Sequence, residues 1–246
     1  MQKKEFSSHI SNQLNRNLEE LFNHILEMGG MVENQLDMAL SALSNSDIKV
    51  AKEVIRFDKT INQAEMEIDR LCIRVLARQQ PTASDLRLIL STIRIAIDLE
   101  RMGDEICKLA KLVIKFQKSD PNVCSDFAGY SELVDITTRS REMLKVTLNA
   151  FARVSAEDAM SILDQEEVVD QVYAKACADV TSQFKKNPEN VECLLEVMTA
   201  LRASERLSDH ALNIMESIIY LVQGKDIRNM DQGRLTEFLE KISGDE

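Results

Sequence analysis

The chain has 246 residues, of which 44% are hydrophobic, with 7 Gly, 3 Pro and no Trp. This length allows one large domain or two of ordinary size, and the scarcity of Gly and Pro favours long helices. The formal net charge of −11 argues against nucleic acid as a partner, because contact with phosphates needs a basic face. It also disfavours a polybasic contact with anionic lipid.

The cysteines are typical of small core residues in a reducing compartment. They show no CxxC spacing, and they are Cys72, Cys107, Cys124, Cys177 and Cys193. The N-terminal MQKKEFSSHI lacks the apolar segment of a secretion signal. No run reaches the roughly 18 apolar residues of a membrane-spanning helix, since even LNIMESIIYLV contains Glu216. We therefore expect a soluble, cytoplasmic protein without direct membrane insertion.

Three long helices are predicted in the first half. Over 12–44, apolar residues recur at steps of three and four and form one continuous stripe: Leu14, Leu18, Leu21, Ile25, Met28, Val32, Leu36, Ala39 and Leu43. A second helix with the same period ends at QQPTASD (79–85), where Ser84 is a candidate N-cap for the third. Short turns between such helices make neighbouring helices antiparallel.

The second half repeats this plan after KSDPNVCSD (118–126), a polar stretch that contains Pro and is typical of a linker. A helix is predicted over 127–153, and SAED (155–158) resembles the capping box that begins the next helix, which extends to about 185. After the turn KNPEN (186–190), the last long helix ends at Gly224, a natural C-cap. One short helix is expected near 231–242.

The predicted fold is therefore all-α, with two similar three-helix bundles related by an internal repeat. The expected boundaries are 1–118 for the first bundle, 119–126 for the linker, 127–224 for the second bundle and 225–246 for an acidic C-terminal tail. A continuous helix through the linker stays open as an alternative.

One acidic motif occurs twice, in IDLERMGDE (97–105) and RASERLSDH (202–210). Each copy has Glu-Arg-x-x-Asp, with the Glu in the apolar stripe of its helix: Glu100, Arg101 and Asp104, then Glu205, Arg206 and Asp209. A carboxylate held away from water costs several kcal/mol unless it is paired. A small residue follows each Glu three positions later, Gly103 or Ser208, and leaves room for a cation or for water.

Counting along the antiparallel neighbours predicts which residues face each motif. In the first half, Asp58, Asn62 and Glu65 fall at the height of Glu100 and Asp104, with Asp69 one turn further. In the second half, the same count sets Asp170 near Glu205 and Glu166 near Asp209. Each half thus brings about four oxygen-bearing side chains to one level, a grouping that predicts either a metal site or half-exposed helix flanks with Arg101 and Arg206 paired to their neighbours.

Clustered carboxylates need positive charge, and oxygen ligands suit Mg, Mn, Ca or iron. The di-iron site of ferritin-like bundles needs Glu-x-x-His on two helices, and none of His9, His24 and His210 stands three residues after a Glu. His210 follows Asp209, so it either joins a site or is an ordinary, partly exposed histidine. Because the sequence contains no Gly-rich phosphate loop and no GxSxG, we predict no catalytic residues and no organic cofactor.

Five motifs in order resemble the PhoU family, the phosphate-transport accessory proteins that negatively regulate the bacterial phosphate regulon. They are DKTINQAEMEID (58–69), QQPTASDLRLIL (79–90), DLERMGDEI (98–106), EEVVDQVY (166–173) and SERLSDHALNI (204–214). The resemblance implies iron or zinc held by E(D)xxxD pairs, here Glu65 with Asp69, Glu100 with Asp104, Glu166 with Asp170 and Glu205 with Asp209. Ser204 and Ser208 depart from the family pattern, which puts the second site in doubt.

The same resemblance implies a non-enzymatic regulator. It would couple the ATPase of the phosphate ABC transporter to the phosphate sensor histidine kinase, repress the phosphate-starvation response, and reach the inner membrane through these partners. A homodimer is expected, because two shallow bundles leave extended helix faces to cover. Two rival readings are a carboxylate-bridged metalloenzyme and a helical scaffold without metal.

Overall fold

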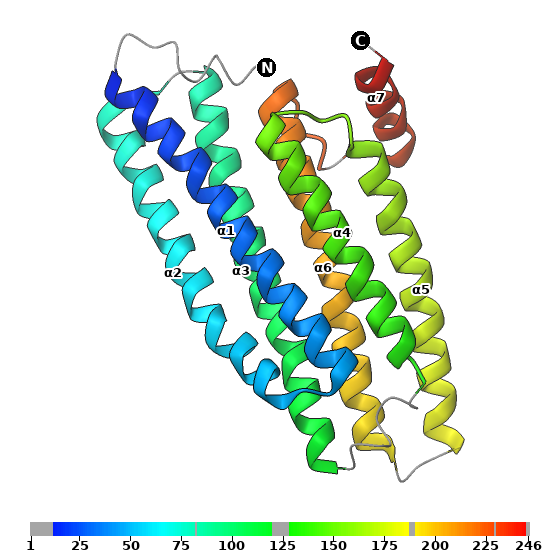
Figure 1. Cartoon of the computed structure of the whole chain (residues 1–246). Coiled ribbons are helices and arrows are strands. Elements are labelled where there is room, and N and C mark those ends of the chain that lie inside the picture. Colours follow the sequence, from blue (N-terminus) through cyan, green and yellow to red (C-terminus); the bar gives the residue numbers. More distant parts are fainter. Residues whose placement is uncertain (1–11, 82, 120–127, 187–189, 229, 245–246) are drawn as a thin grey trace.

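The computed structural model describes residues 12–81, 83–119, 128–186, 190–228 and 230–244. All regular secondary structure in these ranges is helical, which confirms the predicted all-α class: α1 (Asn12–Asn45), α2 (Ile48–Gln79), α3 (Ala83–Ser119), α4 (Tyr130–Arg153), α5 (Ala159–Lys186), α6 (Val191–Gln223) and α7 (Gln232–Gly244). The helices α1–α3 form one bundle and α4–α6 a second bundle beside it (Figure 1). None of the described helices is long and apolar enough to cross a membrane.

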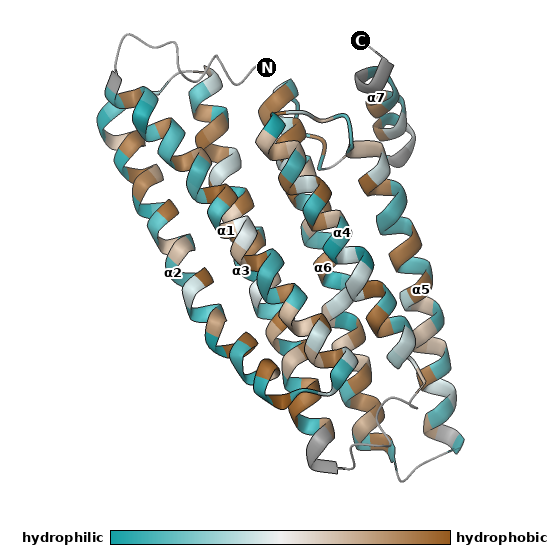
Figure 2. Ribbon diagram, viewed as in Figure 1, coloured by the Kyte–Doolittle hydropathy of each residue, from teal (hydrophilic) through white to brown (hydrophobic). Residues whose placement is uncertain are grey.

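The apolar stripe of α1 faces the core as predicted. All nine stripe residues are buried, with exposed fractions of 7% or less. Figure 2 shows hydrophobic bands recurring along the long helices, each separated by hydrophilic turns. The energy of the fold therefore comes chiefly from the burial of these faces, at about 25 cal/mol per Å² of apolar surface.

Several helix ends follow the predicted chemistry. The carboxylate of Asp47 accepts hydrogen bonds from the backbone N–H groups of Lys49 (2.8 Å) and Val50 (3.2 Å) and so caps α2. Gly224 ends α6 with a φ of 71°, and its N–H donates to the carbonyl of Tyr220 at 2.9 Å. The predicted C-cap is confirmed because this left-handed conformation is the one that favours glycine.

Two predicted starts are wrong. Since α3 begins at Ala83, Ser84 lies inside its first turn and is not the N-cap. The segment 155–158 forms a turn before α5, in which the hydroxyl of Ser155 accepts from the N–H of Glu157 at 3.3 Å; it is no capping box. Ser119, the first residue of the predicted linker, still belongs to α3. Residues 120–127, where the rest of the linker and the start of the fourth helix were predicted, lie outside the described residues, so the domain boundaries stay a prediction.

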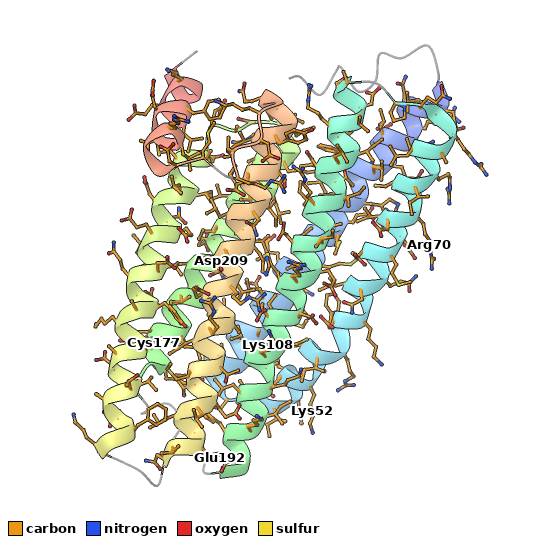
Figure 3. The ribbon with its side chains drawn as sticks, turned by 180° about the vertical axis from the view of Figure 1, so that it is seen from behind. Lys52, Arg70, Lys108, Cys177, Glu192 and Asp209 are labelled. Carbon is orange, nitrogen blue, oxygen red and sulfur yellow. The ribbon has the colours of Figure 1, made fainter. Side chains whose placement is uncertain are left out.

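The two bundles are joined mainly by α3 and α6, which lie side by side at the centre of the molecule (Figure 3). They run antiparallel, because residues later in α3 contact residues earlier in α6. The hydroxyl of Ser91 donates to the carbonyl of Ser217 at 3.1 Å, and a 2.7 Å ion pair joins Glu105 to Arg206. Both helices are therefore buried on more than one side, whereas the sequence pattern predicted a single stripe.

A second contact between the bundles joins α1 to α4 and depends on Gly29. A Cβ built on Gly29 would collide with the end of the Leu148 side chain, whereas one on Gly30 meets nothing within 4 Å. Glycine in a helix interior costs about 0.5–1 kcal/mol relative to alanine. Alanine substitutions at these two neighbouring glycines therefore form a matched test, because they differ only in the contact with Leu148.

We expect Gly30→Ala to raise the free energy of unfolding by about 0.5–1 kcal/mol, because it gains helix propensity in open space. Gly29→Ala gains the same propensity but must displace the end of the Leu148 side chain, so we expect it to be less stable than Gly30→Ala. Urea denaturation of both variants measures the difference. Equal stabilisation by the two substitutions would contradict close packing of α1 on α4.

Candidate metal centres and the interface between the bundles

Four carboxylates of the first bundle, here called the first acidic cluster, gather between α2 and α3. They are Asp58, Glu65, Glu100 and Asp104. Burial raises the pKa of Glu100, and the negative charges of the other three raise it further. Burial and the charge of Asp69 likewise raise the pKa of Glu65. The height count along antiparallel helices thus placed these residues together, and Glu100 is half-buried.

The inner wall of this cluster contains a side chain that the sequence did not single out. Gln35 on α1 is fully buried, and its Nε2 donates to the carbonyl of Val54 (3.3 Å) and to Oδ1 of Asp58 (3.5 Å). Nε2 also lies 3.8 Å from the sulfur of Cys107, and the two oxygen acceptors fix the orientation of the amide. Its Oε1 consequently has no hydrogen-bond partner among the described residues. A glutamine at a buried position of an otherwise apolar helix face is the signal that could have revealed it.

Gly103 makes room for the side chains of Asp58 and Gln35, while the predicted room for a cation or water stays a prediction. A Cβ on Gly103 would stand 3.0 Å from Oδ1 of Asp58 and 3.4 Å from Oε1 of Gln35. Cys107, one turn along α3, lies beside the same carboxylate, and burial together with Asp58 raises the pKa of its thiol to about 12. This cysteine therefore stays a neutral thiol.

The structure separates the two remaining candidates on α2. Asn62 is half-buried, and its Oδ1 is buried without a hydrogen-bond partner in the described part of the chain. Asp69 is exposed; its charge raises the pKa of Glu65 but is not among the causes that act on Glu100. The pair Glu65–Asp69 implied by the family resemblance therefore has one half-buried and one exposed member, and metal binding by this pair stays a prediction.

The second acidic cluster consists of Glu166 and Asp170 on α5 with Glu205 and Asp209 on α6. Burial, Asp170 and Asp209 raise the pKa of Glu166 to about 7. Burial and then Asp209 raise the pKa of Glu205 to about 7 as well, against the opposing charge of Arg202. The predicted neighbours are brought together here too, around the middle of α6, where Figure 3 labels Asp209.

One cation is built into this second cluster. The guanidinium of Arg202 forms an ion pair with Oε1 of Glu205 and lies 5.9 Å from the centre of the Tyr173 ring. Glu205 is only 6% exposed, and its Oε2 is buried without a hydrogen-bond partner in the described structure. Oε1 of Glu205 thus has a positively charged partner, whereas Oε2 has no hydrogen-bond partner among the described residues.

The serines of the second motif are satisfied by local hydrogen bonds. Ser208 donates to the carbonyl of Glu205 at 2.6 Å. The hydroxyl of Ser204 is paired with that of Thr137 on α4 at 2.8 Å, and Ser140 donates to the Ser204 carbonyl at 3.3 Å. Small hydroxyl side chains therefore join α4 to α6 at Ser204, whereas Ser208 is satisfied within α6.

Two motif residues point across the interface between the bundles. His210 is buried, at 4% exposure, and its Nδ1 lies 2.9 Å from Oδ1 of Asp98 on α3. The expectation of a partly exposed histidine is therefore wrong, because α3 covers it. The ion pair of Arg206 in the described structure is with Glu105 of α3 at 2.7 Å, so the partner lies in the other bundle and not on its own helix.

The donor chemistry of both clusters suits a hard divalent cation, since carboxylate and amide oxygens are its usual ligands. The buried, unpartnered oxygens of Gln35 and Asn62 agree with this. Among the described residues, however, no three Asp, Glu, His or Cys side chains are arranged as a ready metal site. The clusters therefore supply the right atoms without a preformed coordination shell.

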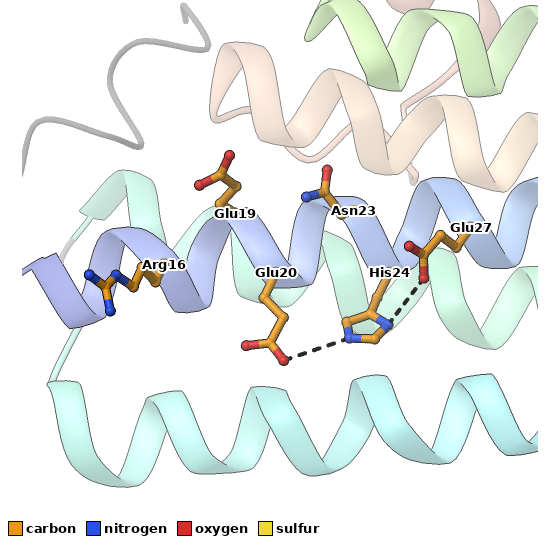
Figure 4. Close-up of a pocket in the computed structure, with 6 residues that line it drawn as sticks. All are labelled: Arg16, Glu19, Glu20, Asn23, His24 and Glu27. Carbon is orange, nitrogen blue, oxygen red and sulfur yellow. Dashed lines mark ion pairs between the residues drawn. The ribbon is translucent and has the colours of Figure 1, made fainter.

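A surface hollow of about 320 Å³ lies apart from both clusters, on α1 (Figure 4). Its lining is Arg16, Glu19, Glu20, Asn23, His24 and Glu27. His24 stands 3.8 Å from Glu20 and 3.7 Å from Glu27. These contacts join residues three and four positions apart on one exposed helix, where such pairs contribute about 0.5 kcal/mol or less.

Comparison with known proteins decides the family. The PhoU domain matches this chain twice, over residues 25–113 and 133–218. The chain belongs to the PhoU family. The two matched stretches each contain one acidic cluster, so the internal repeat is a repeat of the PhoU domain.

The sequence similarity to other PhoU proteins extends over nearly the whole of this chain. The phosphate-specific transport system accessory protein PhoU homolog of Pseudomonas putida is 42% identical over 95% of this chain and 90% of its own length. The corresponding PhoU of Escherichia coli K12 is 35% identical over 95% of each protein. The crystal structure of PhoU from Pseudomonas aeruginosa aligns with a TM-score of 0.81 and 41% identity, over 86% of this chain and 99% of that one. The crystal structure of the phosphate transport system regulatory protein PhoU from Streptococcus pneumoniae aligns with a TM-score of 0.76 and 31% identity, over 85% of this chain and 96% of that one.

The raised pKa values predict how pH acts on the metal-free protein. The folded state keeps a proton on Glu166 up to about pH 7, whereas the unfolded state loses it near 4.5. Stability must therefore fall as pH rises between these values and stay level above them. Glu166→Gln removes this loss, so at pH 8 with chelator we expect it to be about 1 kcal/mol more stable than the parent, and no different below pH 4.5.

Denaturant melts at pH 4.5 and pH 8 measure this effect, with Glu53→Gln as the control, since Glu53 is exposed on α2. A Glu166→Gln variant that is no more stable than the parent at pH 8 would show that the cluster is not electrostatically strained.

Proposed function

We propose that this chain is an accessory protein of a phosphate-specific transport system, and that it couples the transporter ATPase to the phosphate-sensing histidine kinase. In this role it represses the phosphate-starvation response while phosphate is plentiful. The observation that carries the proposal is the similarity, over 95% of the chain, to proteins named for that accessory role at 35–42% identity.

The geometry supports a protein that acts by contact. Two bundles side by side present long helix faces, and several large apolar side chains on them are exposed. Ile73 on α2 is 62% exposed, Leu195 on α6 is 54% exposed and Met66 on α2 is 47% exposed. Exposed apolar groups of this kind favour binding to other proteins. We include a homodimer in the proposal, because a second copy is one way of covering such faces.

The second part of the proposal is that the acidic clusters bind metal. Iron or zinc is the choice that the family resemblance gives, and the oxygen donors suit Mg or Mn as well. A bound cation would compensate the charges of Glu100 in the first cluster and of Glu205 in the second. The chain's own residues would hold it through carboxylate oxygens, with Gln35 and Asn62 as neutral oxygens beside the first cluster.

A binding assay tests the regulatory role. Purified chain is immobilised and exposed separately to the phosphate transporter ATPase, to the phosphate sensor kinase and to the ATPase of an unrelated ABC importer, in high and in low phosphate. We expect retention of the first two and not of the third. Failure to retain either phosphate-system protein in both conditions would contradict the proposal.

Elemental analysis tests the metal sites. Protein purified without chelator is compared with Glu100→Gln, which removes one charge from the first cluster, and with Glu53→Gln on the exposed face of α2. We expect the metal content per chain to be lower in Glu100→Gln than in the other two proteins, because the loss of a carboxylate that holds or supports a metal lowers affinity about tenfold or more. Equal metal in all three proteins would contradict the assignment.

A further inference from the structure

The two acidic clusters differ at the residue three positions before each motif glutamate. Matching Glu100 to Glu205 sets Ile97 of α3 against Arg202 of α6. Ile97 is apolar and 37% exposed. The repeat therefore has a guanidinium at this place in one copy and an aliphatic side chain in the other.

A second difference lies on the facing helices. When Asp58 of α2 is aligned with Glu166 of α5, most buried residues of α2 fall opposite buried residues of α5. Seven residues further along, α2 then has Glu65 where α5 has Tyr173. The first cluster thus gains a carboxylate at the place where the second has an aromatic ring.

These differences change the charge of the two clusters. In the second, Arg202 pairs with Glu205 and lies over Tyr173, so the protein itself supplies one cation. In the first, none of the four carboxylates has a Lys, Arg or His side chain within 4.0 Å in the described part of the chain. The charge of Arg101 opposes the rise in the pKa of Glu100, but no ion pair joins a cation to any of these four carboxylates among the described residues.

The buried amide of Gln35 is an independent sign of a ligand at the first cluster. Its Oε1 has no hydrogen-bond partner among the described residues and lies next to Asp58, in the space left by Gly103. A neutral amide oxygen among carboxylates is a common ligand of hard cations. On the corresponding side of the second cluster, α4 presents Thr137 and Ser140, whose hydroxyls are already bonded to α6.

We infer that the first acidic cluster is the stronger divalent-cation site of the chain, and that Arg202 takes the place of such a cation in the second cluster. The inference deepens the metal binding in the proposed function and rests on it. A guanidinium that is already paired with Glu205 competes with a metal ion for that carboxylate, whereas no carboxylate of the first cluster has such an ion pair among the described residues.

Titration of the chelator-treated, full-length protein with Mn²⁺, followed by electron paramagnetic resonance, tests the inference. Two substitutions exchange the distinguishing residue: Ile97→Arg places a guanidinium in the first cluster, and Arg202→Met removes it from the second. Leu195→Arg is the matched control, since it adds the same charge at an exposed apolar position of α6 away from the motif. Ile97→Lys is a second variant in case the bulk of arginine disturbs folding.

We expect one tight Mn²⁺ site in the parent chain and in Leu195→Arg, at least about tenfold weaker binding in Ile97→Arg and Ile97→Lys, and a second tight site in Arg202→Met. Two sites of equal strength in the parent chain, or undiminished binding in both Ile97 variants, would overturn the inference and leave metal binding by the clusters in place. Absence of Mn²⁺ binding in every variant would overturn both.

Discussion

The need to compensate buried carboxylates governs the middle of this molecule. Glu100 and Glu205 occupy positions that the helix pattern reserves for apolar side chains, and each is surrounded by further acids from the neighbouring helix. An isolated charge in such a place costs several kcal/mol. The second bundle pairs Glu205 directly with the guanidinium of Arg202, whereas in the first the charge of Arg101 acts on Glu100 without an ion pair among the described residues.

The packing of α3 against α6 holds the two clusters in their places. Both motif glutamates stand on these central helices, and the same stretches carry the polar contacts between the bundles. His210 reaches Asp98, and Arg206 reaches Glu105. One stretch of helix therefore presents carboxylates to its own bundle and polar partners to the other, so a change of charge in a cluster is directly adjacent to the interface. This proximity gives a physical route by which a bound ion could influence how the bundles sit together.

The sequence predicted much of this arrangement because long helices with short turns leave few choices. The steps of three and four in α1 identified its buried face, and counting from the turns placed Asp58 beside Glu100 and Asp170 beside Glu205. The sequence did not show that α3 and α6 are covered on several sides. A second buried face adds apolar residues between those of the first, so the spacing of three and four becomes less clear. His210 was misjudged for that reason, and Gln35 was missed because a polar residue in an apolar stripe does not reveal its partner.

Local helix starts were also less predictable than helix cores. Ser84 has the right chemistry for an N-cap, yet the helix begins one residue earlier, at Ala83. Capping energies of about 1 kcal/mol are small beside the burial of a helix face, so tertiary packing decides such boundaries. The serines of the second motif are satisfied separately: Thr137 and Ser140 of α4 bond to Ser204, and Ser208 donates to the carbonyl of Glu205 on its own helix.

The most direct test of the account is a crystal structure of the chain grown with Mn²⁺ and measured for anomalous scattering. The account predicts an anomalous peak within about 2.2 Å of carboxylate oxygens of the first acidic cluster, on the side of Gln35 and Gly103. An empty first cluster with Glu100 turned into bulk solvent, at a concentration of Mn²⁺ that fills other sites of the crystal, would contradict it.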